Sequence, residues 1–109
     1  FTHVRDMVEA YWLAIDRCPP GELHLIGSDE SQKIHSYREI IEMLIKKSTI
    51  DKIEIKQDPK YVRPTTVPRL IGDTTKFNKL TNWSPKLDID EILDDTLDYW
   101  RNFVKNNDY

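Results

Sequence analysis

The chain has 109 residues, of which 39% are hydrophobic and 32% are charged, and its formal net charge is −3. This length fits one domain, because domains cluster around roughly 100–150 residues. The acidic balance argues against a protein that binds nucleic acid or a membrane surface, since such proteins usually carry a basic patch. The single cysteine, Cys18, cannot form an internal disulfide, so a reducing, cytoplasmic location is expected.

The glycine content, the lengths of the apolar runs and the first residues exclude further classes of protein. Three glycines in the whole chain exclude both common Gly-rich phosphate loops. No apolar run approaches the roughly 18 residues that predict a membrane span. The opening residues lack the pattern of a signal peptide, and the sequence begins with Phe1 instead of methionine. We therefore expect the chain to be a piece of a longer protein.

The first half of the chain predicts a helix and then a strand. Residues 4–15 place apolar side chains at spacings of three and four, which puts them on one helical face. Thr2 is the expected N-cap, and the helix is expected to end before Pro19. Residues 22–26 alternate between polar and apolar side chains, which predicts a strand.

The remaining elements are marked by their caps and by alternation. Ser36 and Glu39 form a capping box that opens a helix, and residues 52–56 alternate as a second strand. Residues 57–68 are an irregular loop with three prolines, followed by a short third strand at 69–71. Asp73 or Thr74 can cap a short helix, and Asp88 opens the last one. The predicted fold is a small mixed α/β domain with about three short strands and four helices.

Several residues have side chains that could act in catalysis or bind a metal, but structural roles explain them better. The three histidines (His3, His24 and His35) lack the strained turn of a serine nucleophile and a second ligand at metal spacing. We therefore interpret them as ordinary surface residues and predict neither a catalytic residue nor a metal site. The acidic side chains from Asp88 to Asp98 are expected on a solvated helix face. Four aromatic residues at helical core spacing are expected to pack in the core: Trp12, Phe77, Trp100 and Phe103.

The loop before the third strand carries an excess of positive charge. Four cations (Lys56, Lys60, Arg63 and Arg69) face one acid, Asp58, which gives +3 inside a chain of −3. A planar guanidinium can bind two oxygens of a diphosphate at once, and Pro64 stiffens the backbone directly after Arg63. The loop can therefore bind an anion such as a diphosphate, or can simply be a solvated, proline-rich turn.

The same loop resembles a known family. Segments 63–73 (RPTTVPRLIGD), 75–76 (TK) and 80–85 (LTNWSP) resemble the C-terminal part of GDP-mannose 4,6-dehydratases and of the related GDP-4-keto-6-deoxy-mannose reductases. Both groups are extended short-chain dehydrogenases/reductases, within the NAD-dependent epimerase/dehydratase family. Residues 1–11 (FTHVRDMVEAY) resemble the family's Arg-Asp-Phe-x-x-Val-x-Asp-Val-x-x-Ala segment, and residues 37–40 (YREI) resemble its Arg-Glu helix start.

The resemblance implies that residues 1–109 are the C-terminal nucleotide-sugar substrate-binding lobe of a Rossmann-type enzyme. The dinucleotide-binding domain, with its glycine-rich NAD(P) loop and Tyr-x-x-x-Lys pair, is absent from this chain. In such enzymes the arginine equivalent to Arg63 contacts the substrate diphosphate, and the residue three positions on contacts the ribose. That second residue is usually Asp or Glu, and here it is Thr66, which leaves the choice of nucleotide open. Val4 and Arg5 lie where the family's substrate pocket begins.

The resemblance also implies an activity, with alternatives. The full protein is expected to use NADP or NAD to dehydrate GDP-mannose to GDP-4-keto-6-deoxy-mannose, while this fragment alone binds no cofactor and is inactive. Its implied partners are a GDP-sugar substrate, the missing Rossmann domain and further copies of the full-length chain. A GDP-4-keto-6-deoxy-mannose reductase, or another NAD(P)-dependent epimerase or dehydratase, is the alternative enzyme. A stand-alone nucleotide-binding module and a regulatory subunit without activity are alternatives of a different class.

Overall fold

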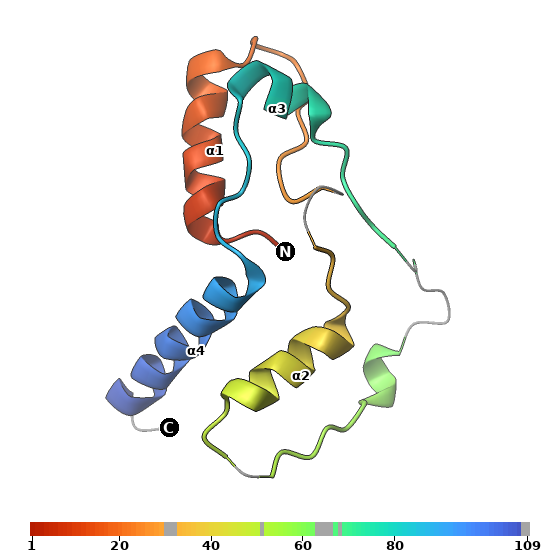
Figure 1. Ribbon diagram of the computed structural model, residues 1–109, viewed down its shortest axis with the longest axis vertical. Coiled ribbons are helices and arrows are strands. Elements are labelled where there is room, and N and C mark those ends of the chain that lie inside the picture. The colour runs from red at the N-terminus through yellow and green to blue at the C-terminus, as the bar shows by residue number, and fades with distance from the viewer. Residues whose placement is uncertain (30–32, 51, 63–66, 68, 108–109) are drawn as a thin grey trace. The chain divides into compact units, whose positions relative to one another are not determined.

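The computed structural model describes residues 1–29, 33–50, 52–62, 67 and 69–107. These residues contain four α-helices, α1 (Val4–Arg17), α2 (Tyr37–Lys47), α3 (Thr75–Thr81) and α4 (Ile89–Asn106), and a short 3₁₀ turn, η1 (Pro59–Tyr61) (Figure 1). The chain divides into two units. The first comprises Phe1–Ile34 and Ile71–Tyr109, and the second comprises His35–Leu70. None of the helices is long and apolar enough to cross a membrane, as far as the described residues go.

The prediction of a mixed α/β domain is wrong. Segments 22–26 and 52–56 and residues 69–71 form no strand, and the described part of the chain contains no sheet. Alternation shows only that an extended segment would have two different faces, whereas a strand also needs a second segment to pair with its backbone. The apolar side chains of these segments lie exposed instead, as at Leu23 (82%), Ile55 (58%) and Leu70 (90%).

The ends of the helices follow the capping signals closely. Ser36 with Glu39 and Asp88 with Glu91 form complete capping boxes at the starts of α2 and α4, which confirms both predictions. At α1 the predicted cap, Thr2, is wrong. The Nδ1 atom of His3 accepts the backbone N–H of Arg5 instead, while the Thr2 hydroxyl accepts the backbone N–H of Ser28 at 3.1 Å.

The core of the first unit lies where α1 packs against α3, the two helices that Figure 1 draws side by side. Ala10 and Phe77 are fully buried, Trp83 is 3% exposed, and the Phe77 and Trp83 rings meet edge to face with centroids 5.7 Å apart. Four partly buried residues complete this core: Leu13, Ala14, Cys18 and Ile26.

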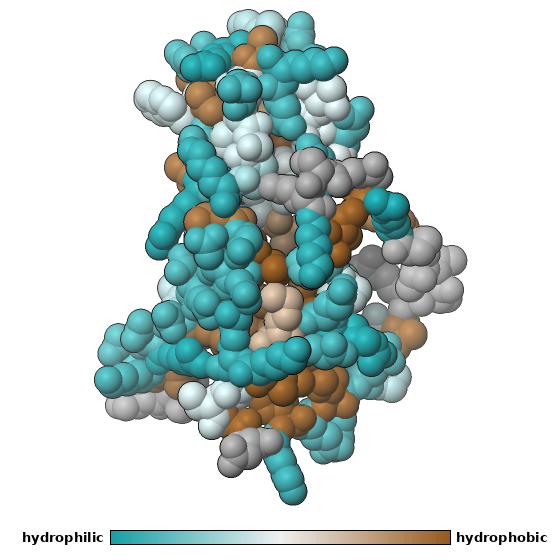
Figure 2. Space-filling view, in the orientation of Figure 1, coloured by the Kyte–Doolittle hydropathy of each residue, from teal (hydrophilic) through white to brown (hydrophobic). Residues whose placement is uncertain are grey.

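Three of the four aromatic residues expected in the core are exposed. Phe77 is buried as predicted, but Trp12 is 71% exposed, Trp100 is 54% exposed and Phe103 is 38% exposed. On α1 the small face around Ala10 packs against α3, so the large apolar face with Val8 and Trp12 stays outside. Brown apolar residues accordingly come to the surface at several places in Figure 2.

Candidate functional site

The four residues proposed from the resemblance fall in two groups. Arg63 and Thr66 lie outside the described residues, so their predicted roles stay predictions. Val4 and Arg5 form the first turn of α1, and Val4 is 68% exposed. Arg5 forms an ion pair with Asp95 of α4, with 3.1 Å between its Nη2 atom and an Asp95 carboxylate oxygen.

His3 contacts the same Asp95 carboxylate. The interpretation of His3 as a surface residue is wrong. It is 6% exposed, and its Nε2 atom lies 3.2 Å from Asp95 Oδ2. Because Nδ1 accepts the backbone N–H of Arg5, this arrangement requires the ring proton on Nε2, where it can be donated to Asp95. Asp95 therefore connects α4 to the start of α1, and it is not merely part of a solvated acidic face.

Asp6 completes this connection between the two ends of the first unit. Its side chain is buried, and one carboxylate oxygen accepts the backbone N–H groups of Lys86 and Leu87 at 3.2 and 3.1 Å. The Lys86 ammonium also binds Glu9 at 2.6 Å. A buried carboxylate requires such donors, because leaving it unpaired would cost several kcal/mol. Asp6 thus fixes the turn that precedes α4.

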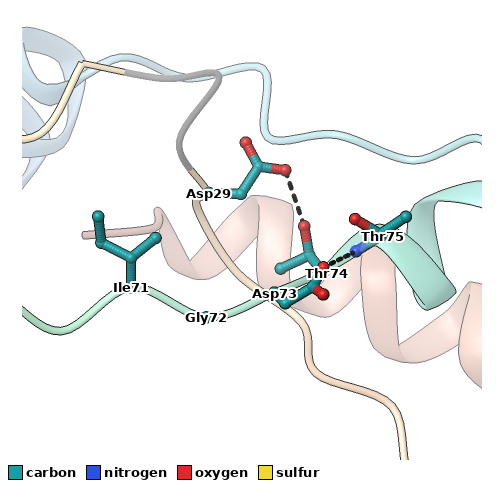
Figure 3. A pocket seen from close by; sticks show the side chains of 6 residues that line it. All are labelled: Asp29, Ile71, Gly72, Asp73, Thr74 and Thr75. Atoms are coloured by element: carbon teal, nitrogen blue, oxygen red, sulfur yellow. Dashed lines mark hydrogen bonds between the residues drawn. The ribbon is translucent and has the colours of Figure 1, made fainter.

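A small pocket lies in the first unit directly after the basic loop. It has a volume of about 270 Å³ and is lined by Asp29 together with residues 71–75 (Figure 3). Val4 and Arg5 do not line it. The structure therefore does not gather the described substrate residues at this pocket.

Hydrogen bonds hold the acidic wall of the pocket in place. The hydroxyl of Thr74, which is 2% exposed, donates to Asp29 Oδ2 at 2.8 Å (Figure 3). The side-chain amide of Asn78 donates to the same oxygen at 3.2 Å and to the Thr74 hydroxyl at 2.9 Å. Asp29 is thereby fixed to the start of α3, although the two segments are far apart in the sequence.

The second carboxylate of the pocket is held ionised by its neighbours. The hydroxyl and the backbone N–H of Thr75 both hydrogen-bond Asp73, and they lower the pKa of its carboxyl group. The described lining thus offers two carboxylates and two threonine hydroxyls, without a cation. Such a wall accepts hydrogen bonds from hydroxyl or ammonium groups, and it does not suit a phosphate.

The remaining titratable side chains were compared with the requirements of a metal site and with the predicted exposure of the histidines. Among the described residues, no cluster of His, Cys, Asp and Glu is arranged to hold a metal ion. The His24 side chain is 7% exposed and its ring lies edge-on to Phe77, with 6.2 Å between centroids, so it is not a surface residue either. No pattern in the sequence links Asp29 to Thr74 and Asn78, because a side-chain network across distant segments leaves no periodic signal.

Comparison with known proteins assigns the chain to a family. The family described as GDP-mannose 4,6 dehydratase matches residues 1–96. The GDP-mannose 4,6 dehydratase of Drosophila melanogaster is 31% identical, over 87% of this chain and 28% of that protein. That of Dictyostelium discoideum is 31% identical over 97% of this chain and 34% of its own length. That of Homo sapiens is 32% identical over 84% of this chain and 28% of its own length.

The extent of these matches is as informative as their identity. The chain spans about a third of the length of each of these relatives or less, while most of the chain itself is matched. The segments that carry the resemblance in the sequence lie inside the matched range, residues 1–96. This chain belongs to the GDP-mannose 4,6 dehydratase family.

Proposed function

We propose that this chain is the C-terminal, nucleotide-sugar-binding part of a longer enzyme that dehydrates GDP-mannose to GDP-4-keto-6-deoxy-mannose. The observation that carries the proposal is the family match over residues 1–96, by a chain that spans only 28–34% of the length of its named relatives. The contribution of this part is binding energy and orientation of the substrate, which place the sugar correctly for chemistry performed elsewhere in the protein.

The basic loop supplies the proposed contact with the diphosphate. Arg63 is the residue we assign to it, since a guanidinium can donate two parallel hydrogen bonds to phosphate oxygens. Thr66 is assigned to the nucleoside ribose, where a hydroxyl replaces the family's usual carboxylate. Val4 and Arg5 are assigned to substrate binding by the resemblance alone. The Asp95 carboxylate beside Arg5 holds that guanidinium at the start of α1.

The pocket lined by Asp29 and residues 71–75 does not fit a nicotinamide dinucleotide. Gly72 lines the pocket, but a Cβ atom built there would meet nothing within 4 Å, so this glycine does not mark a close approach to a phosphate. The pocket wall also presents the carboxylates of Asp29 and Asp73, which would repel a pyrophosphate. We therefore assign the cofactor, NADP or NAD, to the part of the protein outside this chain.

The first test is the intact mass of the polypeptide from its natural source. A Rossmann domain of the expected size would raise the mass to about three times the 13.0 kDa of this chain. A natural product of 13.0 kDa would contradict the enzyme assignment. It would leave a stand-alone binding module, the alternative of a different class, with the basic loop as its ligand site.

The second test is a substitution in the full-length enzyme, assayed with GDP-mannose. Arg63→Ala should raise the KM about tenfold or more while the melting temperature changes little, because a charge-assisted bidentate contact is lost. Arg38→Ala, at the start of α2 and outside the loop, is the matched control and should leave the KM within twofold. An unchanged KM for Arg63→Ala would contradict the assignment of the loop.

A further inference from the structure

The turn η1, the short green helix in Figure 1, carries an aromatic side chain within the basic loop. Asp58 caps this turn, because its Oδ1 atom accepts the backbone N–H of Lys60 at 2.9 Å. The backbone N–H of Tyr61 donates to the carbonyl of Asp58 at 3.0 Å, and that of Val62 donates to the carbonyl of Pro59 at 3.2 Å. Three hydrogen bonds therefore hold the backbone on both sides of Tyr61.

The ring of Tyr61 lies open to solvent beside a cation. Tyr61 is 75% exposed, and the Lys60 ammonium lies over its ring, 5.7 Å from the centroid. This cation–π contact favours one arrangement of the two side chains, so less conformational entropy is lost when a ligand covers the ring. The flat apolar surface of the ring suits a planar group, which would stack on it.

The same segment combines this ring with an excess of positive charge. Tyr61 is the only aromatic residue between Lys56 and Arg69, the stretch that carries the local charge of +3. Proteins that bind single-stranded nucleic acids combine positive charge for the phosphates with aromatic side chains on which the bases stack. In a segment this short, the combination suits a single nucleotide, which presents one base and its own phosphates.

We propose that Tyr61 stacks on the base of the nucleotide-sugar. The proposal rests on the proposed function, in which Arg63 contacts the diphosphate of the same ligand. Arg63 follows Tyr61 by two positions in the sequence, and in a nucleotide only the ribose separates the base from the phosphates. Neighbouring positions of the loop thus serve neighbouring parts of the ligand. Every base has a π face, so Tyr61 supplies affinity without selecting which base is bound.

Calorimetric titration of the full-length enzyme, with its dinucleotide cofactor bound, can separate the base from the diphosphate. GDP presents both groups, whereas inorganic pyrophosphate has no base. Tyr61→Ala should raise the dissociation constant of GDP about tenfold and leave that of pyrophosphate within about twofold, because only GDP loses a stacking partner. Arg63→Ala should raise both constants, since both ligands present phosphate oxygens. An unchanged affinity for GDP in Tyr61→Ala would overturn the proposal.

Two further variants distinguish stacking from other roles of this side chain. Tyr61→Phe keeps the ring and removes the hydroxyl, so it should bind GDP within about twofold of the unsubstituted enzyme. Tyr37→Ala removes a tyrosine that is 79% exposed at the start of α2, outside the loop, and it should leave the affinity for GDP unchanged. A loss of affinity in Tyr61→Phe as large as that in Tyr61→Ala would assign the contact to the hydroxyl and overturn stacking.

Turnover of GDP-mannose by the same preparations keeps this proposal distinguishable from the proposed function. Turnover that is lost in no variant, with weaker GDP binding in Arg63→Ala but not in Tyr61→Ala, would overturn stacking alone. An enzyme that binds GDP through Tyr61 but does not convert GDP-mannose would support stacking and contradict the proposed reaction. An unsubstituted enzyme that binds no GDP would overturn both.

Discussion

In the first unit, α1 and α3 bury Ala10 and Phe77 against each other, whereas in the second unit α2 buries Ile40 and exposes most of its other residues. Both units contain well-capped helices, and α2 opens with a capping box as complete as that of α4. The difference shows that caps and helical spacing act locally and can specify a helix anywhere. Burial requires a second surface, and among the described residues the first unit provides one where α1 meets α3.

Among the expected effects on stability that test this comparison, the largest comes from the core of the first unit. Phe77→Ala should lower the free energy of unfolding by about 3–5 kcal/mol, because a fully buried ring is removed and Trp83 loses its edge-to-face partner. Urea denaturation followed by tryptophan fluorescence measures the change. Leu80→Ala, on the same helix but 41% exposed, is the control and should cost clearly less. Equal losses in both variants would show that α3 is not anchored through Phe77.

Asp6 provides the next largest effect, through a polar group instead of an apolar one. Asp6→Ala leaves the backbone N–H groups of Lys86 and Leu87 without their acceptor, so the free energy of unfolding should fall by about 1–3 kcal/mol. Asp6→Asn keeps one side-chain oxygen and should lose less.

The neighbouring Glu9 supplies the control for Asp6. Glu9→Gln removes an exposed ion pair with Lys86, so it should change the free energy of unfolding by less than about 1 kcal/mol. The same chemical denaturation experiment compares all three variants. A loss for Glu9→Gln as large as that for Asp6→Ala would mean that the surface ion pair, and not the buried carboxylate, fixes the turn before α4.

The two capping boxes allow the two units to be compared directly. Ser36→Ala and Asp88→Ala each remove an acceptor for the N3 backbone N–H, at a cost of about 1 kcal/mol to the helix concerned. Because α2 has little burial to support it, Ser36→Ala should speed hydrogen exchange across α2 while α1 and α3 stay protected. Faster exchange in α1 after Ser36→Ala would contradict the division into two units.

Sequence reasoning succeeded where the determining contacts are local. The four helices and the capping boxes at Ser36 and Asp88 were predicted, since each depends on residues within a few positions of one another. The predicted strands failed because alternation at 22–26 and 52–56 carries no information about a pairing partner. On α1 the apolar pattern selected the face with Trp12, whereas the smaller Ala10 face allows the close approach of α3.

The residues of the candidate site also differ in how far the sequence could predict them. The acidic network of Asp29, Thr74 and Asn78 depends on segments far apart in the sequence, so no local pattern predicted it. Arg63 and Thr66 were selected by resemblance to a family, and the family itself is confirmed over residues 1–96. Their roles remain predictions, because family membership does not fix what an individual side chain contacts, above all where Thr66 departs from the usual carboxylate.

The smallest expected effect is a dependence on pH that arises in the first unit. The ammonium of Lys76 lies 2.9 Å from Glu22 and lowers the pKa of that carboxyl group, first by hydrogen bonding and then by its charge. Thr75 lowers the pKa of Asp73 in the same direction. Both carboxyl groups keep their charge to lower pH in the folded chain than in the unfolded one. Their stabilising effect is thus complete at neutral pH and is lost as the pH falls below about 5, through the lowered pKa values.

Two substitutions that remove opposite ends of one ion pair can test this dependence. Glu22→Gln removes the titrating group and Lys76→Met removes the cation that lowers its pKa, so both should make the free energy of unfolding depend less steeply on pH in acid. Lys46→Met, in the last turn of α2, is the matched control and should keep the slope of the unsubstituted chain. Because Glu22 and Lys76 are both substantially exposed, added salt should reduce the difference between Glu22→Gln and the unsubstituted chain. An acid dependence unchanged by Glu22→Gln would assign it to other carboxylates of the first unit, Asp73 foremost.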